Sequence, residues 1–253
     1  MAGHSKWANI KHKKAKSDEK RGKEFTKVAK EITIAVRTGG GGDPEANSKL
    51  KLAIQKAKAI NMPNDNITRA IKKGTGELDS DVLEEIVYEG YAPGGVAVML
   101  EIATDNRNRT ASEIRHYFSK NNGNLGETGC VAWMFNRVGL ISIARENITM
   151  DEEEFMLKAL EIGAEDVRDE EEQFDVITSV DTFLEIKEAL EQDGFTIDEA
   201  DVVMLPENMV EIDDVDVAAR IIKLIDLLED HDDVQNVYTN MTVTDEVMEK
   251  LAT

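Results

Sequence analysis

The sequence predicts a multi-domain α+β protein, in which a basic N-terminal helical bundle precedes two ferredoxin-like α/β domains, one inserted in the other. Three observations support this fold class. Apolar residues in the first 76 positions recur at helical spacing between breaks that contain Gly or Pro. From residue 137 to 205 the expected elements follow the order β-α-β-β-α-β, the split-βαβ arrangement. Basic and acidic residues are also concentrated in different parts of the chain.

The two parts differ sharply in charge. Residues 1–76 contain 18 Lys and Arg against 7 Asp and Glu, a net charge of +11. Residues 77–253 contain 12 Lys and Arg against 44 Asp and Glu, a net charge of −32. The basic part is therefore able to bind a polyanion such as nucleic acid. The alternative is that the two parts simply dock on each other, although docking alone does not explain the density of Lys at the N-terminus.

The chain begins with a segment, residues 1–23, that is rich in Lys and has no apolar stripe. We expect it to form a basic, loosely ordered arm. Trp7 in this arm either stacks on an unpaired base or covers the core of the bundle. The candidate nucleic-acid-binding residues lie in this arm and along the helices after it. They are His4, Lys6, Trp7, Lys11, His12, Lys13, Lys14, Lys16, Lys20, Arg21, Lys23, Lys27, Lys30, Arg69, Lys72 and Lys73.

Three helices are expected in the rest of the basic part. The first, Phe25–Val36, carries one apolar stripe, leaves its Lys residues solvated and ends at a run of four glycines. The second starts at Asp43-Pro44-Glu45, where Asp43 is a plausible N-cap and Pro44 suits the first turn. The third runs from about Asn64 to Lys73 and ends at Gly74.

Strand-like and helix-like segments alternate in the acidic part. The segments expected first are strands Leu83–Tyr91 and Val96–Ala103, joined by the turn Ala92-Pro93-Gly94-Gly95, and a helix Thr110–Asn121. The apolar run Cys130–Phe135 should be buried, with Trp133 in the core. The segments expected next are strand Val138–Ala144, helix Asp151–Gly163, strands Asp166–Arg168 and Phe174–Val180, helix Asp181–Asp193 and strand Phe195–Leu205.

The last segments complete the earlier α/β domain. They are a strand Met209–Ile212, a helix Val215–Leu228 and a strand Val234–Thr242. This β-α-β unit, joined to the preceding β-β-α unit, should form a second mixed sheet with two helices. The expected domains are therefore residues 1–77, residues 78–136 together with 206–253, and the inserted residues 137–205.

A polar loop between a buried strand and a helix is a candidate secondary site. It contains Asn106, Arg107, Asn108 and Arg109, and Asn106 or Asn108 is a plausible helix cap. Arginines beside a helix N-terminus suit phosphate or carboxylate groups. The alternative is that they pair with the many carboxylates of the protein itself.

Several classes of protein and site have no support in the sequence. The single Cys, Cys130, excludes an internal disulfide and a zinc site made of Cys ligands. The four His residues are scattered, and the H-E-x-x-H, G-x-S-x-G and EF-hand patterns do not occur. We therefore expect no catalysis, no cofactor and no metal. The basic N-terminus is unlike a secretory signal and no long apolar run occurs, so we expect a cytoplasmic protein without membrane contact.

Four stretches of the sequence resemble the YebC/PmpR family, which includes the mitochondrial translational activator of cytochrome c oxidase. They are GHSKWANIKHKKAKSDEKRGKEFTK, NMPNDNITRAIKKG, YEGYAPGGVAVMLEIATDNRNRTASEIRHYF and GNLGETGCVAWMF. The resemblance extends from Met1 to about Thr242. It implies a helical N-terminal domain, two α/β domains and a non-enzymatic role. That role is either a DNA-binding transcriptional regulator or a ribosome-associated translation factor that relieves polyproline-type stalls.

The two roles place different demands on the basic part. Sequence-specific DNA binding needs side chains that read base edges, and the third helix offers Arg69, Lys72 and Lys73 with Asn66 but no clear reading set. Binding of folded RNA depends less on such a set. We predict a DNA-binding transcriptional regulator that binds nucleic acid through residues 1–76. The alternative is a translation factor that binds ribosomal RNA and whose acidic domains face basic ribosomal proteins.

Overall fold

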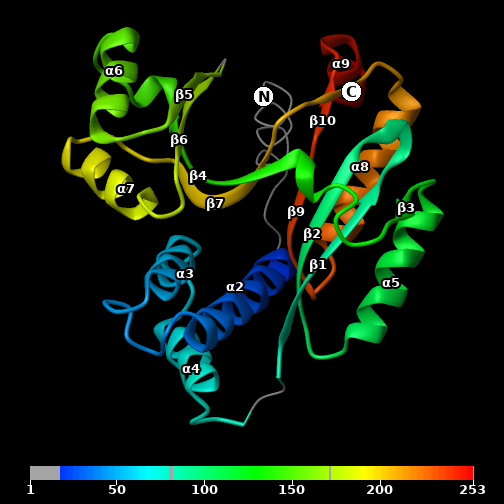
Figure 1. The fold of residues 1–253 in the computed structure, drawn as a ribbon, viewed down its shortest axis with the longest axis horizontal. Helices are drawn as coiled ribbons and strands as arrows, with labels where there is room; N and C mark the ends of the chain where they lie inside the picture. Colours follow the sequence, from blue (N-terminus) through cyan, green and yellow to red (C-terminus); the bar gives the residue numbers. More distant parts are fainter. Residues whose placement is uncertain (1–17, 80–81, 171, 253) are drawn as a thin grey trace. The chain divides into compact units, whose positions relative to one another are not determined.

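The computed structural model describes residues 18–79, 82–170 and 172–252 (Figure 1). It divides into two compact units, and we treat each by itself. One unit contains the described residues up to Ala132 and from Val210 onward, and the other contains Trp133–Met209. The predicted arm residues from His4 to Lys16 lie outside the described part of the chain. The domain boundary near residue 77 stays a prediction.

Three helices form the basic bundle of the first unit. They are α2 (Asp18–Thr38), α3 (Ser48–Ala59) and α4 (Asn64–Thr75). Their shared core contains residues of the apolar stripe predicted for the first helix, such as the fully buried Ile32, together with the fully buried Leu50 of α3. Helix α2 begins at Asp18, so the last residues of the expected arm are helical. The helical pattern was hidden there because residues 18–24 bring no apolar side chain to the stripe.

Two helix ends in the bundle differ from the prediction. Helix α3 is capped by Asn47, and Asp43–Ala46 is a turn before it. The Asn47 side chain accepts a hydrogen bond from Leu50 N and donates to Ala35 O and Gly41 O. This buried residue therefore supplies hydrogen-bond partners to the start of α3 and to the end of α2. Helix α4 runs through Gly74 and ends at Thr75, and the next residue, Gly76, has a φ of 82° that suits a helix C-cap.

A four-stranded antiparallel sheet, a separate two-stranded pair and the helices α5, α8 and α9 form the described α/β part of the first unit. Strands β1 (Glu84–Tyr91) and β2 (Ala97–Thr104) pair in a hairpin, and α5 (Arg107–Lys120) follows, three residues earlier than predicted. The other elements are β3 (Asn124–Leu125), β8 (Val210–Ile212), α8 (Val215–Glu229), β9 (Val234–Thr239), β10 (Met241–Val243) and α9 (Asp245–Ala252). Helices α5 and α8 share one apolar core with strand β2 (Figure 1).

The prediction of a second ferredoxin-like, mixed sheet is wrong for this part. The main sheet has the order β3-β1-β2-β9 and all its pairs are antiparallel, while β8 and β10 form a separate parallel pair. The predicted last strand is interrupted at Asn240. Its side-chain oxygen accepts a hydrogen bond from Ala97 N, and its backbone oxygen accepts one from Val210 N. Asn240 therefore ends the pairing with β2 and starts the pairing with β8.

The second unit has the element order predicted for residues 137–205. Its elements are β4 (Phe135–Ala144), α6 (Glu152–Ile162), β5 (Asp166–Asp169), β6 (Gln173–Thr178), α7 (Phe183–Gln192) and β7 (Glu199–Pro206). The sheet order is β5-β6-β4-β7, with all neighbours antiparallel. The core contains the edge-packed rings of Phe155, Phe174 and Phe195.

The prediction that Trp133 lies in the core is wrong. Its side chain is 68% exposed in a short 3₁₀ turn, although Val131 and Phe135 on either side are buried. The loop before it is fixed by Glu89, a buried carboxylate that accepts hydrogen bonds from the backbone N–H groups of Gly129, Val131 and Ala132 at 2.7–2.8 Å. A turn held by its backbone does not require every apolar side chain on it to be buried.

Candidate nucleic-acid interface

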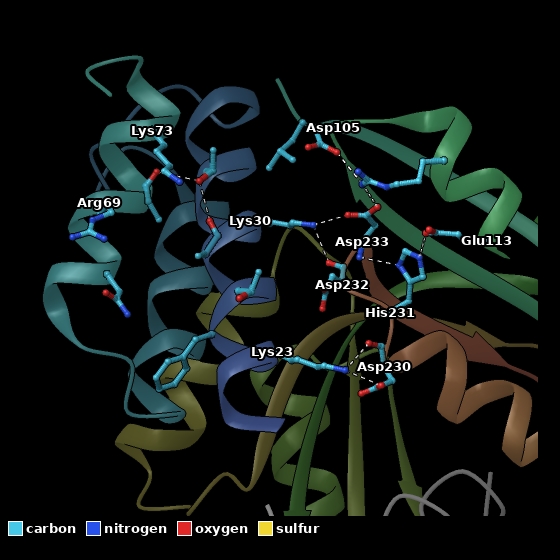
Figure 2. Close-up of a pocket in the computed structure, with 18 of the residues that line it drawn as sticks. Lys23, Lys30, Arg69, Lys73, Asp105, Glu113, Asp230, His231, Asp232 and Asp233 are labelled. Atoms are coloured by element: carbon cyan, nitrogen blue, oxygen red, sulfur yellow. Dashed lines mark hydrogen bonds and ion pairs between the residues drawn. The ribbon is translucent and has the colours of Figure 1, made fainter. Parts of the chain in front are cut away.

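A groove of about 930 Å³ lies within the first unit (Figure 2). Helices α2 and α4 line one side of it, and α5 and the segment 230–233 line the other. The charged residues on the helical-bundle side are Lys23, Lys30, Arg69 and Lys73, and those on the other side are Asp105, Arg109, Glu113, Asp230, Asp232 and Asp233. The groove is therefore basic on one side and mainly acidic on the other.

Three lysines on one face of α2 contact the segment 229–233. Lys23 forms an ion pair with Asp230 at 2.8 Å between Nζ and Oδ2. Lys27 donates a hydrogen bond to the backbone oxygen of Glu229. Lys30 donates to the backbone oxygen of Asp232 at 2.9 Å and to the Asp233 carboxylate at 2.8 Å. These lysines follow one another at spacings of four and three residues, so the helix brings them to a single face.

Asp233 is the centre of this contact. Its side chain is 7% exposed, and its Oδ2 accepts hydrogen bonds from Arg109 at 2.8 Å and from the Thr110 hydroxyl at 2.8 Å. Burial by itself would raise the pKa of Asp233, but the hydrogen bonds from Lys30, Arg109 and Thr110 outweigh it and hold that pKa well below its ordinary value. The carboxylate is therefore ionised and joins α2, α5 and the segment before β9.

The prediction that the Lys residues of the first helix stay solvated is thus wrong for this face. Lys23, Lys27 and Lys30 contact the acidic part, as expected from the alternative that the basic and acidic parts dock on each other. Nucleic acid could use these three lysines only by displacing the segment 229–233.

Other basic residues of the bundle point away from internal partners. Arg69 and Lys72 on α4 are exposed, and Lys73 is half-buried at the groove. Lys49 and Lys58 on α3 are exposed as well. Within the described part of the chain, none of these five side chains has an ion pair or a hydrogen bond. We call these five residues the outer basic set.

Two of the four candidate residues at the start of α5, Asn106 and Arg109, make structural contacts within the protein. Asn106 caps α5 by accepting a hydrogen bond from Arg109 N at 3.1 Å. Arg109 pairs with Asp233 and with Asp105, at 2.8 and 2.9 Å, and its hydrogen bond to Asp233 is the main reason its pKa is raised. Arg107 and Asn108 are exposed. The alternative that these arginines pair with the protein's own carboxylates therefore applies to Arg109.

The remaining candidates divide by position. His4 to Lys16 are outside the described residues, and Lys20 and Arg21 belong to the first turn of α2. The segment 229–233, Glu-Asp-His-Asp-Asp, was not predicted as part of a site. Its partners on α2 lie about 200 positions earlier, at separations of 202 to 207 residues. No sequence period indicates a pairing across such a distance.

His231 completes this segment. Its Nδ1 accepts a hydrogen bond from Asp233 N at 3.0 Å, and its Nε2 lies 2.8 Å from a Glu113 carboxylate oxygen (Figure 2). The His231 side chain is only 8% exposed. Among residues 18–79, 82–170 and 172–252, no group of three or more His, Cys, Asp or Glu side chains is placed to hold a metal ion, and no helix is both long and apolar enough to span a bilayer.

Comparison with known proteins covers nearly the whole chain. Residues 5–77 match the model of the TACO1/YebC protein N-terminal domain, and residues 83–241 match that of the TACO1/YebC second and third domain. A probable transcriptional regulatory protein of Syntrophomonas wolfei is 76% identical over 99% of this chain and 100% of its own length. One of Halothermothrix orenii is 59% identical over 99% of both chains.

A solved structure is also similar. The crystal structure of a conserved hypothetical protein from Aquifex aeolicus superposes with a TM-score of 0.84 at 50% sequence identity, covering 96% of this chain and 98% of that one. Sequence and fold thus agree along the described chain, and the resemblance noted in the four sequence stretches is confirmed. The chain belongs to the TACO1/YebC family.

Proposed function

We propose that this chain is a non-enzymatic, nucleic-acid-binding regulator of gene expression that acts in the cytoplasm on DNA as a transcriptional regulator. The names of its relatives, probable transcriptional regulatory proteins, support the regulatory part. The outer basic set carries the nucleic-acid part. Its five cations on α3 and α4 have no ion pair or side-chain hydrogen bond to a described residue and are available to phosphate groups.

The charge of the rest of the chain supports this assignment of surfaces. Residues 77–253 carry a net charge of −32, so most of their surface repels a polyanion. Nucleic acid is thereby directed to the bundle. Lys23, Lys27 and Lys30 add little to binding while the segment 229–233 holds them.

A translation factor that binds ribosomal RNA is the second candidate. The observation that favours it is the composition of the outer basic set, which contains only Arg and Lys. Such side chains neutralise phosphates of any nucleic acid, and folded RNA is recognised mainly by shape and backbone contacts. Basic ribosomal proteins would then be the partners of the acidic surfaces.

The experiment is a salt titration of binding to a fluorescent duplex DNA and to a fluorescent RNA hairpin of equal length. The variant Arg69→Gln/Lys72→Gln removes two exposed cations three residues apart on α4. The matched control Arg220→Gln/Lys223→Gln removes the same two residue types, also exposed and three residues apart, on α8.

Each phosphate contact on duplex DNA contributes about 0.9 to the slope of log affinity against log salt. We expect the α4 variant to reduce the slope on duplex DNA by about 1.8 and the α8 control to leave it unchanged. Equal slopes for wild type and both variants would refute binding through the bundle. If the α4 variant reduced the slope measured with the RNA hairpin but not the slope measured with duplex DNA, the translation factor would be favoured.

A further inference from the structure

Helix α5 differs in charge from every other described helix of the acidic part. Its sequence carries a net charge of +3, whereas α6, α7, α8 and α9 carry −3, −2, −1 and −2. The two acidic residues at or beside α5 are both engaged: Asp105 with Arg109, and Glu113 with His231. Neither of these carboxylates is therefore without a partner in the described chain.

A polar stripe runs along that outward side. Asn108, Ser112, Arg115 and Ser119 follow at spacings of four, three and four residues, and all four are exposed. Their side chains have no hydrogen bond or ion pair to any other described residue. The opposite side of the helix, with Ile114 and Phe118, is fully buried in the core. The fold thus fixes the helix and leaves this stripe uncovered.

Basic groups border the stripe. Arg107 and Lys120 are exposed near the two ends of α5, and His116 is exposed beside its middle. At 1.5 Å per residue, Arg107 and Lys120 lie roughly 20 Å apart along the axis. Figure 1 shows α5 at the margin of its unit, where a long ligand can approach it.

We propose that α5 is a DNA-reading helix, whose stripe Asn108–Ser112–Arg115–Ser119 contacts base edges in the major groove while Arg107 and Lys120 contact phosphates. These residue types suit the task, because Arg pairs with guanine, Asn pairs with adenine and Ser contacts either. The occupant is duplex DNA, since its major groove is about 12 Å wide and admits a helix. The major groove of A-form RNA is too narrow for side chains to read.

This inference rests on the proposed function and extends it. The outer basic set supplies contacts that do not depend on sequence, and α5 supplies the base-reading set that α4 lacks. The two surfaces make separable predictions, because phosphate contacts change affinity for all sequences and base contacts change the preference among them.

The test is selection from a library of short DNA duplexes with a randomised centre, followed by sequencing of the bound fraction. Wild type should enrich a defined sequence. Asn108→Ala and Arg115→Ala should each reduce the preference at one or two base pairs by about ten- to hundredfold. The matched control Arg220→Ala, an exposed Arg on α8, should keep the wild-type sequence preference. Arg69→Gln/Lys72→Gln should lower the affinity for every sequence and leave the sequence preference unchanged.

The outcomes separate the two proposals. Duplex binding by wild type without any sequence preference, or an unchanged preference in both Asn108→Ala and Arg115→Ala, would overturn the reading role of α5 and leave the proposed function standing. Binding of an RNA hairpin with no duplex binding would also overturn it. If the wild-type protein bound neither the DNA duplexes nor the RNA hairpin, the proposed function itself would be refuted.

Discussion

Asp233 shows how one residue joins parts of the chain that the sequence keeps far apart. Its carboxylate is buried and accepts hydrogen bonds from Lys30 on α2 and from Arg109 and Thr110 on α5. A buried acid with such partners is tolerated because the partners replace the water it loses. Removing it takes away the carboxylate that pairs with Lys30 and leaves Arg109 paired with Asp105 alone, so its substitution should be costly.

We predict that Asp233→Ala lowers the free energy of unfolding by about 3 kcal/mol, the usual cost of removing one partner of a buried ion pair. The control is Asp232→Ala, whose exposed side chain makes no ion pair or hydrogen bond to a described residue, and it should cost less than about 0.5 kcal/mol. Urea unfolding followed by circular dichroism measures both. Equal effects of the two substitutions would contradict the account of Asp233.

The depressed pKa of Asp233 also predicts how stability depends on pH. A carboxylate with a lowered folded-state pKa stabilises the fold fully above its ordinary pKa of 3.8, and this stabilisation is lost as the pH falls toward the folded-state value. The free energy of unfolding of wild type should therefore decrease from about pH 4 downward, and Asp233→Asn should show a shallower decrease. An identical pH dependence in the two proteins would exclude this role.

For single residues, the sequence predicted which side chains lie off the apolar stripe, but it did not predict what those side chains contact. Lys23, Lys27 and Lys30 were correctly placed off the apolar stripe, but their partners in the segment 229–233 were not foreseeable from helical spacing. Trp133 was assigned to the core from its apolar neighbours, and it is exposed because a turn replaces the expected buried run.

At the scale of elements, Gly74 shows why composition alone misplaces a helix end. Gly favours helix ends, yet Gly74 lies inside α4 where that helix crosses α2. A Cβ atom at this position would lie 2.6 Å from Val36 Cβ and 2.9 Å from Thr33 O. The glycine is required by the close approach of two helices, and no local sequence signal distinguishes this from a C-cap.

We predict opposite signs for the same substitution at two helical glycines. Gly74→Ala should destabilise the protein by about 1–3 kcal/mol, because the helices must separate to admit the methyl group. Gly22→Ala in α2, where a Cβ would meet nothing within 4 Å, should stabilise it by up to about 1 kcal/mol. Thermal unfolding of both variants tests the pair, and a stabilising Gly74→Ala would contradict the packing described for α2 and α4.

Glu89 allows a local test of the loop before Trp133. Its carboxylate accepts three backbone hydrogen bonds, from Gly129, Val131 and Ala132. Glu89→Gln replaces one acceptor oxygen by a donor, so we expect these three amides to exchange hydrogen at least about tenfold faster. Glu85→Gln, at an exposed position of the same strand, is the control and should leave their exchange unchanged. Unchanged exchange in Glu89→Gln would show that other contacts hold the loop.

Most elements were predictable because apolar periodicity marks them directly. The order of strands and helices in Trp133–Met209 followed from its alternating pattern, as did the hairpin β1–β2 with its Pro-Gly-Gly turn. The separate β8–β10 pair was not predictable, since it depends on the hydrogen bonds of Asn240 to residues far away in sequence. Helix α9 was missed entirely.

At the scale of the whole molecule, the separation of charge is the feature that links sequence to function. The N-terminal part has a net charge of +11 and the rest −32, which the sequence gives without any structure. The structure adds that part of the basic surface is neutralised internally by the segment 229–233, while the outer basic set on α3 and α4 remains accessible. The positive charge of α5 was hidden by the strongly acidic average of its surroundings.

Crosslinking in living cells tests the proposal that this chain regulates gene expression by binding DNA. DNA and RNA attached to wild type and to Arg69→Gln/Lys72→Gln would both be sequenced. We predict discrete promoter DNA peaks for wild type that weaken in the variant and persist in Arg220→Gln/Lys223→Gln. A sharp ribosomal RNA footprint without promoter peaks would contradict the claim and identify a translation factor instead.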